Sequence, residues 1–460
     1  MNGGLIDVFT QIAKRFPDHP AVAHNGSALS YIEVDAKVQA MAERLGPRPG
    51  VVGVRTSRTP TTVIEMFGVW AAGGTYCPID PTYPEERQRA MRAAAGCGKP
   101  ATSASEDHAY ILFTSGSTGE PKPVVTPQTA IAATVRSLRD LFGLSAADRV
   151  LQFASLNWDT CFEEILPTLT TGATLVFDDE AYTGSFPRFL RMVERQRITL
   201  LDLPTAFWHE LVLHLAQERA GLPECLRVMV IGGEAVNPAR LADWRALDTG
   251  GIRLVNTYGC TETTLITHAV DLHGPQAKPG AADGKVPIGW ALPHVIEHVS
   301  NDDELLIGGP AVALGYKGLP EATEARFVAV DGIRYFRTGD RVSRAGDGAL
   351  VPEGRLDHEV KIRGIRVDPA EVEALIAAHP GVSAVAAMGV PLAGRTALVA
   401  YVVVRPGDEE RVSEGALREY LRTRVPEHLV PSRINVVPQL IYTTSGKIDR
   451  AKSREFFDER

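Results

Sequence analysis

A loop rich in small polar residues is the first part of the chain from which chemistry is expected. It follows the strand-like run Tyr110–Phe113, precedes Lys122 and consists of Thr114, Ser115, Gly116, Ser117, Thr118 and Gly119. Glycine lets backbone N–H groups approach anionic oxygens, and hydroxyl groups add hydrogen-bond donors. The pattern is typical of a phosphate-binding loop, but a surface loop rich in small residues has the same composition.

A Walker A loop does not fit this segment. That motif needs Gly-x-x-x-x-Gly-Lys-Ser/Thr. Five residues after Gly116 stands Pro121, and Pro123 follows Lys122. The spacing argues against a P-loop nucleoside triphosphatase and leaves the kind of phosphate site open.

Length, composition and charge restrict the class of protein. A chain of 460 residues is too long for one ordinary core, so about two or three domains are expected. Hydrophobic content of 44% and charged content of 23% are typical of a soluble globular protein. The formal net charge of −8 argues against a nucleic-acid-binding protein, which would need a basic surface to neutralise phosphates.

Membrane and secretory signals are not expected in this sequence. It contains no apolar run of transmembrane length, and Met1–Asp7 lacks the layout of a signal peptide. The cysteines are scattered, odd in number and never in a Cys-x-x-Cys pair: Cys77, Cys97, Cys161, Cys225 and Cys260. We therefore expect neither a disulfide framework nor a zinc site, and a cytoplasmic location.

Alternating strand and helix patterns predict an α/β fold. Apolar runs predict strands over 173–177, 198–203 and 228–231, and helical spacing predicts a helix over 185–196. A self-contained αβ pattern follows the turn residues Gly354–Asp357. In it, Asp368 and Pro369 predict a helix start, followed by a strand over 398–404 and a helix over 415–424. A domain boundary near Asp357 gives domains of residues 1–356 and 357–460.

Five motifs stand in a fixed order along almost the whole chain: Phe113–Lys122, Asn256–Glu262, Tyr335–Asp340, Gly354–Asp357 with Lys361–Gly364, and Ser445–Arg450. Together they resemble the motifs of the ANL superfamily of adenylate-forming enzymes, specifically the stand-alone type of amino-acid adenylation domain from nonribosomal peptide synthesis. The resemblance implies a large N-terminal adenylation core of packed αβ subdomains and a small mobile C-terminal α+β lid domain carrying a catalytic lysine. Pro123, Pro127 and Cys260 depart from the usual pattern, but none replaces a catalytic group.

The resemblance also assigns roles at the nucleotide. Asp340 would accept hydrogen bonds from the ribose hydroxyls with Arg355 as its helper, and Tyr258 would stack on adenine. Glu262 resembles the magnesium ligand, since a hard oxygen donor suits a hard cation. The other implied ATP-binding residues are Thr114, Ser115, Gly116, Ser117, Thr118, Gly119, Lys122, Gly233, Glu234, Ala235, Asn256, Gly259 and Thr261.

Lys447 resembles the lysine that bridges the substrate carboxylate and the α-phosphate of ATP. A cation there would stabilise two anions that must approach each other. The carboxylate is ionised at pH 7, so no general base is needed. In the same family the C-terminal domain rotates between adenylation and thioester formation, with Asp357 at the hinge and Gly364 near the pantetheine arm.

The implied substrate pocket contains two acidic residues. Asp159 resembles the aspartate that pairs with a substrate ammonium, which indicates an amino acid. Glu163 is a second carboxylate in an otherwise apolar lining, where it needs a second positive charge, and Gly232 leaves room for a substrate side chain to reach it. We therefore predict that the substrate is a diamino acid. The lining resembles that of β-lysine-loading domains; it comprises Asp159, Thr160, Glu163, Ala206, Val230, Gly232, Thr257, Leu265, Ile266 and Lys447.

The predicted function is ATP- and Mg²⁺-dependent formation of an aminoacyl-AMP, followed by transfer to the phosphopantetheine thiol of a separate carrier protein. Lysine, ornithine and diaminopropionate remain alternative substrates, and Glu163 could instead point away or meet a protein cation. An acyl-CoA synthetase of the same superfamily and a non-catalytic nucleotide-binding regulator are the alternative functions. Neither a nucleic acid nor a membrane partner is expected, and an MbtH-like activator is left open.

Overall fold

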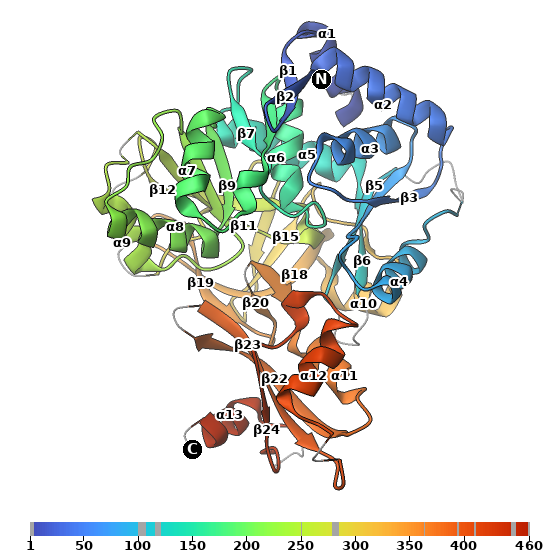
Figure 1. Cartoon of the computed structure of the whole chain (residues 1–460), viewed down its shortest axis with the longest axis vertical. Coiled ribbons are helices and arrows are strands. Elements are labelled where there is room, and N and C mark those ends of the chain that lie inside the picture. Colours follow the sequence, from blue (N-terminus) through green and yellow to red (C-terminus); the bar gives the residue numbers. More distant parts are fainter. Residues whose placement is uncertain are drawn as a thin grey trace. The chain divides into compact units, whose positions relative to one another are not determined.

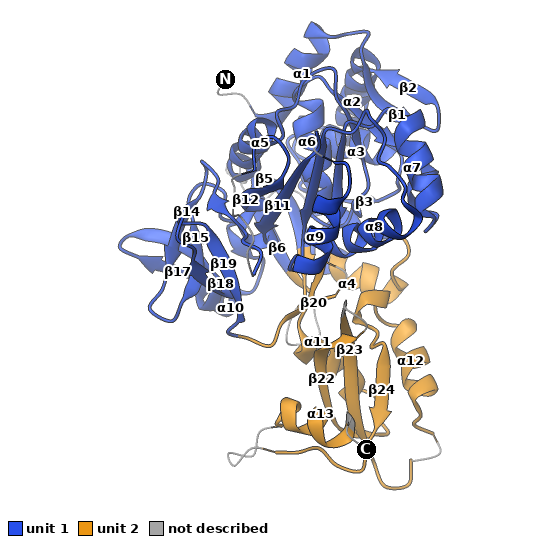
Figure 2. Ribbon diagram, turned by 90° about the vertical axis from the view of Figure 1, so that its left-hand side faces the viewer, with its two compact units in different colours: residues 1–80, 92–112, 123–356 blue, residues 81–91, 113–122, 357–460 orange. Residues whose placement is uncertain are grey.

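The computed structural model describes residues 4–99, 107–115, 121–249, 251–277, 285–362, 364–392, 395–408, 411–442 and 448–458. Contacts divide the chain into two compact units, drawn in blue and orange in Figure 2. Unit 1 comprises residues 1–80, 92–112 and 123–356, and unit 2 comprises residues 81–91, 113–122 and 357–460. None of the helices within the described ranges is long and apolar enough to span a bilayer.

The largest sheet of unit 1 has nine strands among the described residues, in the order β13-β12-β11-β10-β9-β7-β8-β1-β2. Figure 1 labels β12, β11, β9, β7, β1 and β2 of this sheet. The strands from β11 to β1 run parallel, and antiparallel pairs close both ends. The strands are β1 (Pro20–His24), β2 (Ser27–Ser30), β7 (Arg149–Leu151), β8 (Thr174–Phe177), β9 (Leu200–Pro204), β10 (Val228–Gly232), β11 (Arg253–Gly259), β12 (Ile266–His273) and β13 (Trp290–Ala291).

Two further sheets precede the C-terminal part of the chain. One has the order β16-β6-β5-β4-β3, and the other has the order β14-β15-β18-β17 with β19 paired to β18. Their strands are β3 (Val51–Arg55), β4 (Thr75–Ile79), β5 (His108–Thr114), β6 (Lys122–Pro127), β14 (Ile296–Val299), β15 (Glu304–Gly308), β16 (Gly315–Tyr316), β17 (Phe327–Val330), β18 (Ile333–Arg344) and β19 (Leu350–Arg355).

Helices cover the sheets and bury their own apolar faces. They are α1 (Leu5–Arg15), α2 (Tyr31–Leu45), α3 (Pro60–Ala71), α4 (Glu85–Ala95), α5 (Gln128–Phe142), α6 (Thr160–Leu169), α7 (Phe186–Arg195), α8 (Thr205–Glu218), α9 (Pro238–Ala246) and α10 (Pro320–Arg326). Short 3-10 turns occupy Asp179–Tyr182 and Thr261–Thr263. Helix α2 begins with a capping box, in which the Ser30 hydroxyl accepts from the Glu33 N–H and the Glu33 carboxylate accepts from the Ser30 N–H.

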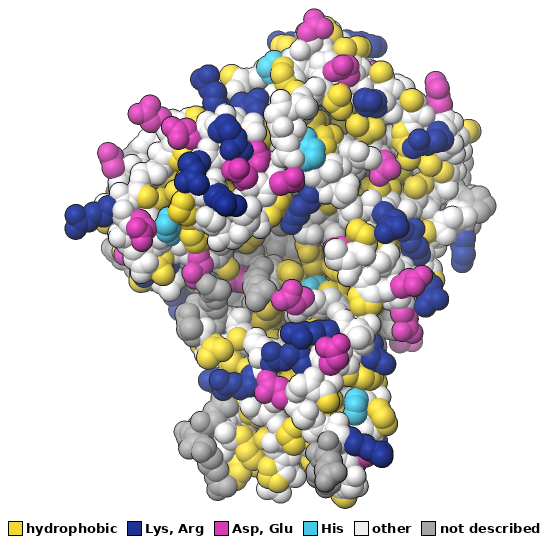
Figure 3. All heavy atoms as spheres, in the orientation of Figure 1, with side chains coloured by type: hydrophobic (Ala, Val, Ile, Leu, Met, Phe, Trp, Pro, Cys, Tyr) yellow, Lys and Arg dark blue, Asp and Glu magenta, His cyan; other side chains and the backbone are white. Residues whose placement is uncertain are grey.

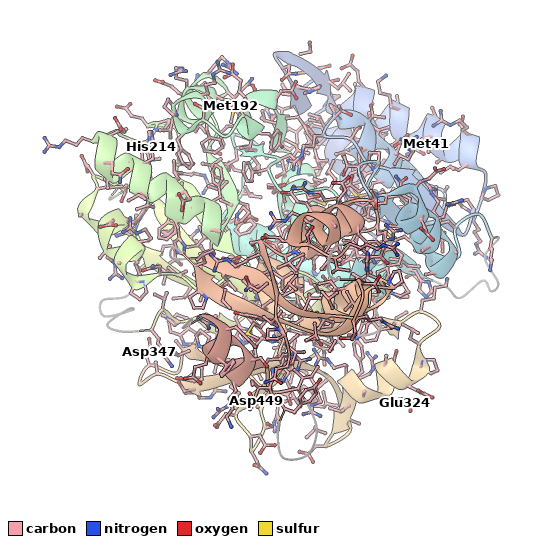
Figure 4. All side chains as sticks on the ribbon, turned by 60° about the horizontal axis from the view of Figure 1, so that its bottom comes forward. Met41, Met192, His214, Glu324, Asp347 and Asp449 are labelled. Atoms are coloured by element: carbon pink, nitrogen blue, oxygen red, sulfur yellow. The ribbon has the colours of Figure 1, made fainter. Side chains whose placement is uncertain are left out.

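Successive side chains along the parallel strands point to opposite faces of the sheet and therefore pack in two separate cores. Val228 and Val230 pack in a core shared with α5 and α6, whereas Met229 and Ile231 pack in a core shared with α7, α8 and α9. Met192 of α7, labelled in Figure 4, belongs to the second core. A parallel strand that is buried on both faces reads as an unbroken apolar run, which explains why the sequence revealed these strands. The predicted strands over 173–177, 198–203 and 228–231 are confirmed as β8, β9 and β10, and the predicted helix as α7.

The C-terminal part of unit 2 is built on a three-stranded sheet. Its strands are β22 (Val382–Leu392), β23 (Arg395–Val404) and β24 (Arg433–Val436), and a separate hairpin joins β20 (Val360–Ile362) to β21 (Ile365–Val367). Helices α11 (Pro369–Ala377) and α12 (Glu414–Arg422) pack on one face, α13 (Arg450–Asp458) packs on the other, and a 3-10 turn spans Glu427–Leu429. The predicted helix start is confirmed, because the Asp368 carboxylate accepts from the Ala370 N–H and Pro369 is the first helical residue.

Two earlier segments of the chain belong to unit 2 by specific contacts. Arg87, in segment 81–91, makes a buried ion pair with Glu371 of α11 at 3.0 Å. Ser115, in segment 113–122, donates its hydroxyl to the Arg366 carbonyl and accepts from the Asp368 N–H. The predicted α/β fold with a large N-terminal and a small C-terminal part is confirmed.

Candidate functional site

Most of the predicted pocket residues lie between α6 and one face of the nine-stranded sheet. Val230 of β10 is in register with Asp202 of β9, and Gly232 is in register with Thr257 of β11. Residues in register on neighbouring parallel strands point to the same face of a sheet. Val230 shares its core with Phe162 of α6, so this face is the one that α6 covers.

Two more predicted pocket residues, Leu265 and Ile266, are buried in the same core. The turn that leads into β12 has left-handed backbone at Thr264 (φ 57°) and at Leu265 itself (φ 67°). Gly259 makes this turn possible, because a Cβ atom at that position would lie 1.8 Å from the Leu265 carbonyl oxygen. Ala206 lies in the first turn of α8, next to Thr205, whose hydroxyl donates to the Gly232 carbonyl.

Asp159 stands at the N-cap position of α6, with Thr160 as the first helical residue, but its side chain does not cap the helix. The carboxyl group is buried, and burial raises its pKa to about 6. A hydrogen bond from the Thr261 side chain partly opposes this shift, and the nearby Glu262 adds to it. Asp159, at the start of the proposed pocket, therefore lies next to the Thr261–Glu262 motif. A cation placed beside the Asp159 carboxyl group would lower its pKa and stabilise its charged form.

Glu163 and Glu164 are adjacent and both buried, but they have different partners. Glu164 accepts hydrogen bonds from the backbone N–H groups of Phe153 and Ala154 and from the Gln152 amide. Glu163 instead meets the carboxyl group of Asp202. Burial, followed by the charges of Asp202 and Asp159, raises the pKa of Glu163 well above its usual range. The hydrogen bonds of Glu164 are thus satisfied by the protein itself, whereas the carboxyl group of Glu163 contacts a second carboxyl group.

Asp202 is the site residue that sequence reasoning missed. Burial raises its pKa to about 7, and the hydrogen bond with Glu163 partly opposes this shift. Its Oδ2 atom is buried without a hydrogen-bond partner among the described residues. The sequence does contain a signal for this residue, because Asp202 is an aspartate that interrupts the apolar run Leu200–Leu203. In the structure this position faces α6. Two buried carboxyl groups in contact must either share a proton or receive a cation.

The predicted ribose residues form a compact cluster in unit 1. Asp340 of β18 and Arg355 of β19 are directly opposed across the strands, and Arg355 Nη1 donates to Asp340 Oδ1 at 2.7 Å. The Tyr258 hydroxyl donates to Asp340 Oδ2 at 2.6 Å. Burial and the charge of Asp340 raise the pKa of Tyr258, which keeps its hydroxyl protonated as a donor. Each oxygen of Asp340 thus keeps one further acceptor position.

Other predicted nucleotide residues cluster at the carboxyl ends of β10 and β11. Gly233, with a left-handed φ of 91°, leads from β10 to Glu234 and Ala235. A Cβ atom at Gly232 would lie 2.5 Å from Thr257 Oγ1, so Thr257 already fills part of the space there. Asn256 donates to the Pro287 carbonyl, and its buried Oδ1 has no partner within the described ranges.

Glu262 is suited to a metal ion that is shared with a substrate. It is 1% exposed, and its Oε1 accepts a hydrogen bond from the Tyr316 hydroxyl at 2.8 Å. The described residues contain no group of three His, Cys, Asp or Glu side chains that could hold a metal by itself. Mg²⁺ is commonly bound by one or two carboxylates together with substrate phosphates, so Glu262 fits that mode.

Unit 2 holds the remaining predicted residues. Thr114 ends β5, Lys122 begins β6, and the charge of Lys122 acts on Asp368. The Asp357 carboxylate accepts from the Glu359 N–H, and Gly364 has a φ of 81° in the turn of the β20–β21 hairpin. Gly116, Ser117, Thr118, Gly119 and Lys447 lie outside the described residues.

Comparison with known proteins identifies the family. Residues 9–98 and 90–317 match the AMP-binding enzymes, and residues 371–447 match the C-terminal domain of AMP-binding enzymes. The isonitrile lipopeptide synthase of Streptomyces coeruleorubidus is 39% identical over 94% of this chain, which covers 32% of that protein. The phosphinothricin tripeptide synthetase of Streptomyces viridochromogenes is 32% identical over 97% of this chain, which covers 44% of that protein. The chain spans about a third of the length of the relatives that it matches first.

Solved structures agree with the sequence comparison. An amide bond synthetase from Marinactinospora thermotolerans superposes with a TM-score of 0.85 at 25% identity, covering 99% of this chain and 100% of its own. An artificially fused adenylation–carrier di-domain from Klebsiella oxytoca superposes with a TM-score of 0.80 at 25% identity, covering 94% of this chain and 93% of its own. The chain belongs to the AMP-binding enzyme family. Within it, the relatives place the chain among the ligases of the adenylation-domain type found in nonribosomal peptide synthetases.

Proposed function

We propose that this enzyme activates a diamino acid as its aminoacyl-AMP, releasing pyrophosphate, and then transfers the aminoacyl group to the phosphopantetheine thiol of a carrier protein or carrier domain. The observation that carries the proposal is the pair of buried carboxyl groups, Glu163 and Asp202, in the pocket that Asp159 opens. Asp159 accounts for one substrate ammonium group, and the Glu163–Asp202 pair accounts for a second.

A neutral or purely aliphatic acid does not explain this pocket. With such a substrate, the Glu163–Asp202 pair would remain buried beside apolar groups without a cation, which is costly. In the described part of the chain, neither Glu163 nor Asp202 forms a hydrogen bond or an ion pair with a basic side chain. The pocket therefore favours an amino acid over the fatty or aryl acids of acyl-CoA synthetases.

In the proposed reaction the substrate carboxylate attacks the α-phosphorus of ATP, and the bond to the pyrophosphate oxygen breaks. Asp159 and the Glu163–Asp202 pair would fix the amino acid at its two ammonium groups, while Asp340 would hold the ribose hydroxyls. Lys447 would offset the charge of the approaching anions. Glu262 would hold Mg²⁺, which when bound neutralises charge on the phosphates.

β-Lysine is the preferred substrate because the pocket lining resembles that of β-lysine-loading domains. Lysine, ornithine and diaminopropionate differ from it in chain length and in the spacing of the two ammonium groups. The test is amino-acid-dependent ATP–pyrophosphate exchange over a panel of these compounds together with neutral amino acids. A strong preference for a neutral amino acid would overturn the diamino acid proposal.

Substitution of the pocket acids sharpens this test. Glu163→Gln or Asp202→Asn removes a charge-assisted hydrogen bond, which is worth about 1.5–3 kcal/mol, or roughly 10- to 100-fold in affinity. We expect the KM for the diamino acid to rise by that factor while the KM for ATP is unchanged. Lys447→Ala is the catalytic control, and it should abolish exchange while ATP binding persists.

A further inference from the structure

Two cysteine residues that the proposed chemistry does not use lie together in unit 1. Cys77 is the buried central residue of β4, and Cys97 is half-buried in the turn that follows α4. The Cys77 thiol donates a hydrogen bond to the Cys97 sulfur. Both thiols are free in this structure.

Gly53 of β3 leaves the space that the Cys97 sulfur occupies. Gly53 is the register partner of Cys77, so both positions share one face of the sheet. A Cβ atom at Gly53 would lie 3.1 Å from Cys97 Sγ and 2.6 Å from Arg92 Nη1. Because glycine has no side chain, the Cys97 sulfur and the Arg92 guanidinium can both lie against β3, beside Cys77.

The surroundings of the two thiols are basic. Arg92 Nη1 donates to the Gly53 carbonyl at 3.2 Å, and Lys317 Nζ lies 3.7 Å from the Cβ position of Gly96. The hydrogen bond from Cys77 and the charges of Arg92 and Lys317 lower the pKa of Cys97 against the effect of burial. The same hydrogen bond, followed by burial, raises the pKa of Cys77. Cys97 is thus the more readily ionised thiol of the pair and the one that is partly exposed, whereas Cys77 is buried.

We propose that Cys77 and Cys97 form a reversible disulfide when the enzyme meets hydrogen peroxide, and that this bond alters amino-acid binding. The Cys97 thiolate attacks a peroxide oxygen, the O–O bond breaks and hydroxide leaves, so that Cys97 becomes a sulfenic acid. The Cys77 thiol then loses its proton, its sulfur attacks the Cys97 sulfur and water leaves. The two thiols supply two electrons, the peroxide becomes two water molecules, and a dithiol reductant reverses the change.

A short path, which combines three residues of backbone with one hydrogen bond, connects this pair to the proposed substrate site. Asp80, which follows β4 and lies three residues beyond Cys77, accepts a hydrogen bond from the Asn157 amide at 2.8 Å. Asn157 also accepts from the Thr56 hydroxyl and lies two residues before Asp159. Drawing the two sulfur atoms into a covalent bond displaces β4 relative to the end of α4, and this displacement reaches Asn157. The effect on binding rests on the proposed function, whereas disulfide formation does not.

The first experiment is mass spectrometry of the full chain after treatment with hydrogen peroxide. We expect the loss of two hydrogen atoms, a peptide in which Cys77 is linked to Cys97, and reversal by dithiothreitol. At pH 7, iodoacetamide should alkylate Cys97 faster than Cys225, a half-buried thiol whose pKa burial raises. Arg92→Met should slow the alkylation of Cys97. Absence of the linked peptide, or equal alkylation of Cys97 and Cys225, would overturn the disulfide.

The second experiment compares the oxidised and reduced enzymes by ATP–pyrophosphate exchange. Oxidation should raise the KM for the amino acid at least threefold and leave the KM for ATP unchanged. Cys97→Ser, which places a small polar group at the half-exposed position, should abolish the effect, and Cys225→Ser should keep it. An unchanged KM in an enzyme shown to contain the disulfide would overturn the link to the substrate site. A lack of exchange with every amino acid would contradict the proposed function and leave the disulfide result standing.

Discussion

At the scale of single residues, the proposed specificity of the pocket rests on two buried carboxyl groups. Glu163 and Asp202 come from different elements, α6 and β9, and the charge of Asp202 raises the energetic cost of ionising Glu163, whereas burial alone raises the pKa of Asp202. An ammonium group between them would turn this repulsion into attraction. The predicted specificity therefore depends on a contact between residues that are far apart in the sequence.

Affinity for the diamino acid is expected to depend on pH. The pKa of Asp202 is raised to about 7, so the empty pocket holds a proton that the substrate ammonium must displace. Lowering the pH from 8 to 6 protonates Asp202, and this should raise the KM for the diamino acid by about tenfold. The measurement is the pH profile of exchange. Asp159, with a pKa of about 6, and Glu164 belong to the same acidic group, so a neutral amino acid is the control for their contribution.

Asp202→Asn is expected to stabilise the protein while it weakens the site. The pKa of Asp202 is higher in the folded protein than in the unfolded chain, so its ionised form destabilises the fold above about pH 7 and less so at lower pH. Without substrate, the variant should melt about 2 °C or more above the parent at pH 8, with a smaller gain at pH 6. Thermal denaturation at both pH values is the measurement. A lower melting temperature at pH 8 would contradict the assignment of an ionised, unpaired acid.

At the scale of elements, described contacts hold both ends of the segment that carries Lys447. Tyr442 and Ile448 form an isolated β-bridge, and the Asp449 N–H donates to the Ile441 carbonyl. Asp449, labelled in Figure 4, also caps α13 by accepting from the Lys452 N–H at 3.0 Å. Arg450 then makes a bidentate ion pair with Glu373 of α11, with both N–O distances 2.7 Å. The fold of unit 2 thus fixes the positions of Tyr442 and Ile448, the described residues that precede and follow this segment.

Breaking the ion pair between α11 and α13 is expected to affect turnover more than binding. Glu373→Gln removes the charge that holds Arg450, and misplacing the lysine segment should lower the kcat of exchange by about tenfold. The KM for ATP should change little. Glu414→Gln is a matched control, because Glu414 pairs with Arg418 on the surface of α12. Equal effects of the two substitutions on kcat would contradict a positioning role for Glu373.

At the scale of the whole molecule, the chain separates into two units that meet in sequence at Leu356 and Asp357. On the face seen in Figure 3, basic and acidic side chains are interspersed over the surface. The proposed amino-acid residues Asp159, Glu163 and Asp202 and the proposed ribose residues Asp340 and Arg355 belong to unit 1, whereas the segment 113–122, which includes the proposed phosphate loop, and the segment 357–460, in which Lys447 stands, are assigned to unit 2. We propose that a two-step reaction with one mobile unit accounts for this separation.

Asp357→Pro is expected to impair thioester transfer more than adenylation. Proline restricts φ at the junction and so hinders the rotation that we propose between the two half-reactions. Exchange should keep at least half of its rate, while loading of a phosphopantetheinylated carrier protein should fall about tenfold or more. Asp357→Ala, which leaves the backbone free to rotate, should load the carrier normally. An equal loss in both half-reactions would contradict a hinge at this residue.

Much of the architecture was predictable because local rules govern it. The apolar runs of β8, β9 and β10 and the helix start at Asp368–Pro369 were recognised from composition and capping patterns alone. The family was predictable as well, since its motifs are continuous stretches of sequence. The bonds of Ser115 to the segment 366–368, and the assignment of segment 81–91 to unit 2, depend on long-range contacts that no local pattern reveals.

The partners of the buried acidic residues Glu163, Glu164 and Asp202 became known only from the tertiary structure. By itself the sequence determined that the chain is an adenylate-forming enzyme, and it predicted an acidic pocket around Asp159. It could not distinguish Glu163 from Glu164, because neighbouring residues on a helix point in different directions and their partners lie on other elements. Nor did its periodicity place Asp202 against Glu163 or Cys77 against Cys97. Those pairs arise where strands in register meet the end of a helix, and a contact of that kind exists only in the folded chain.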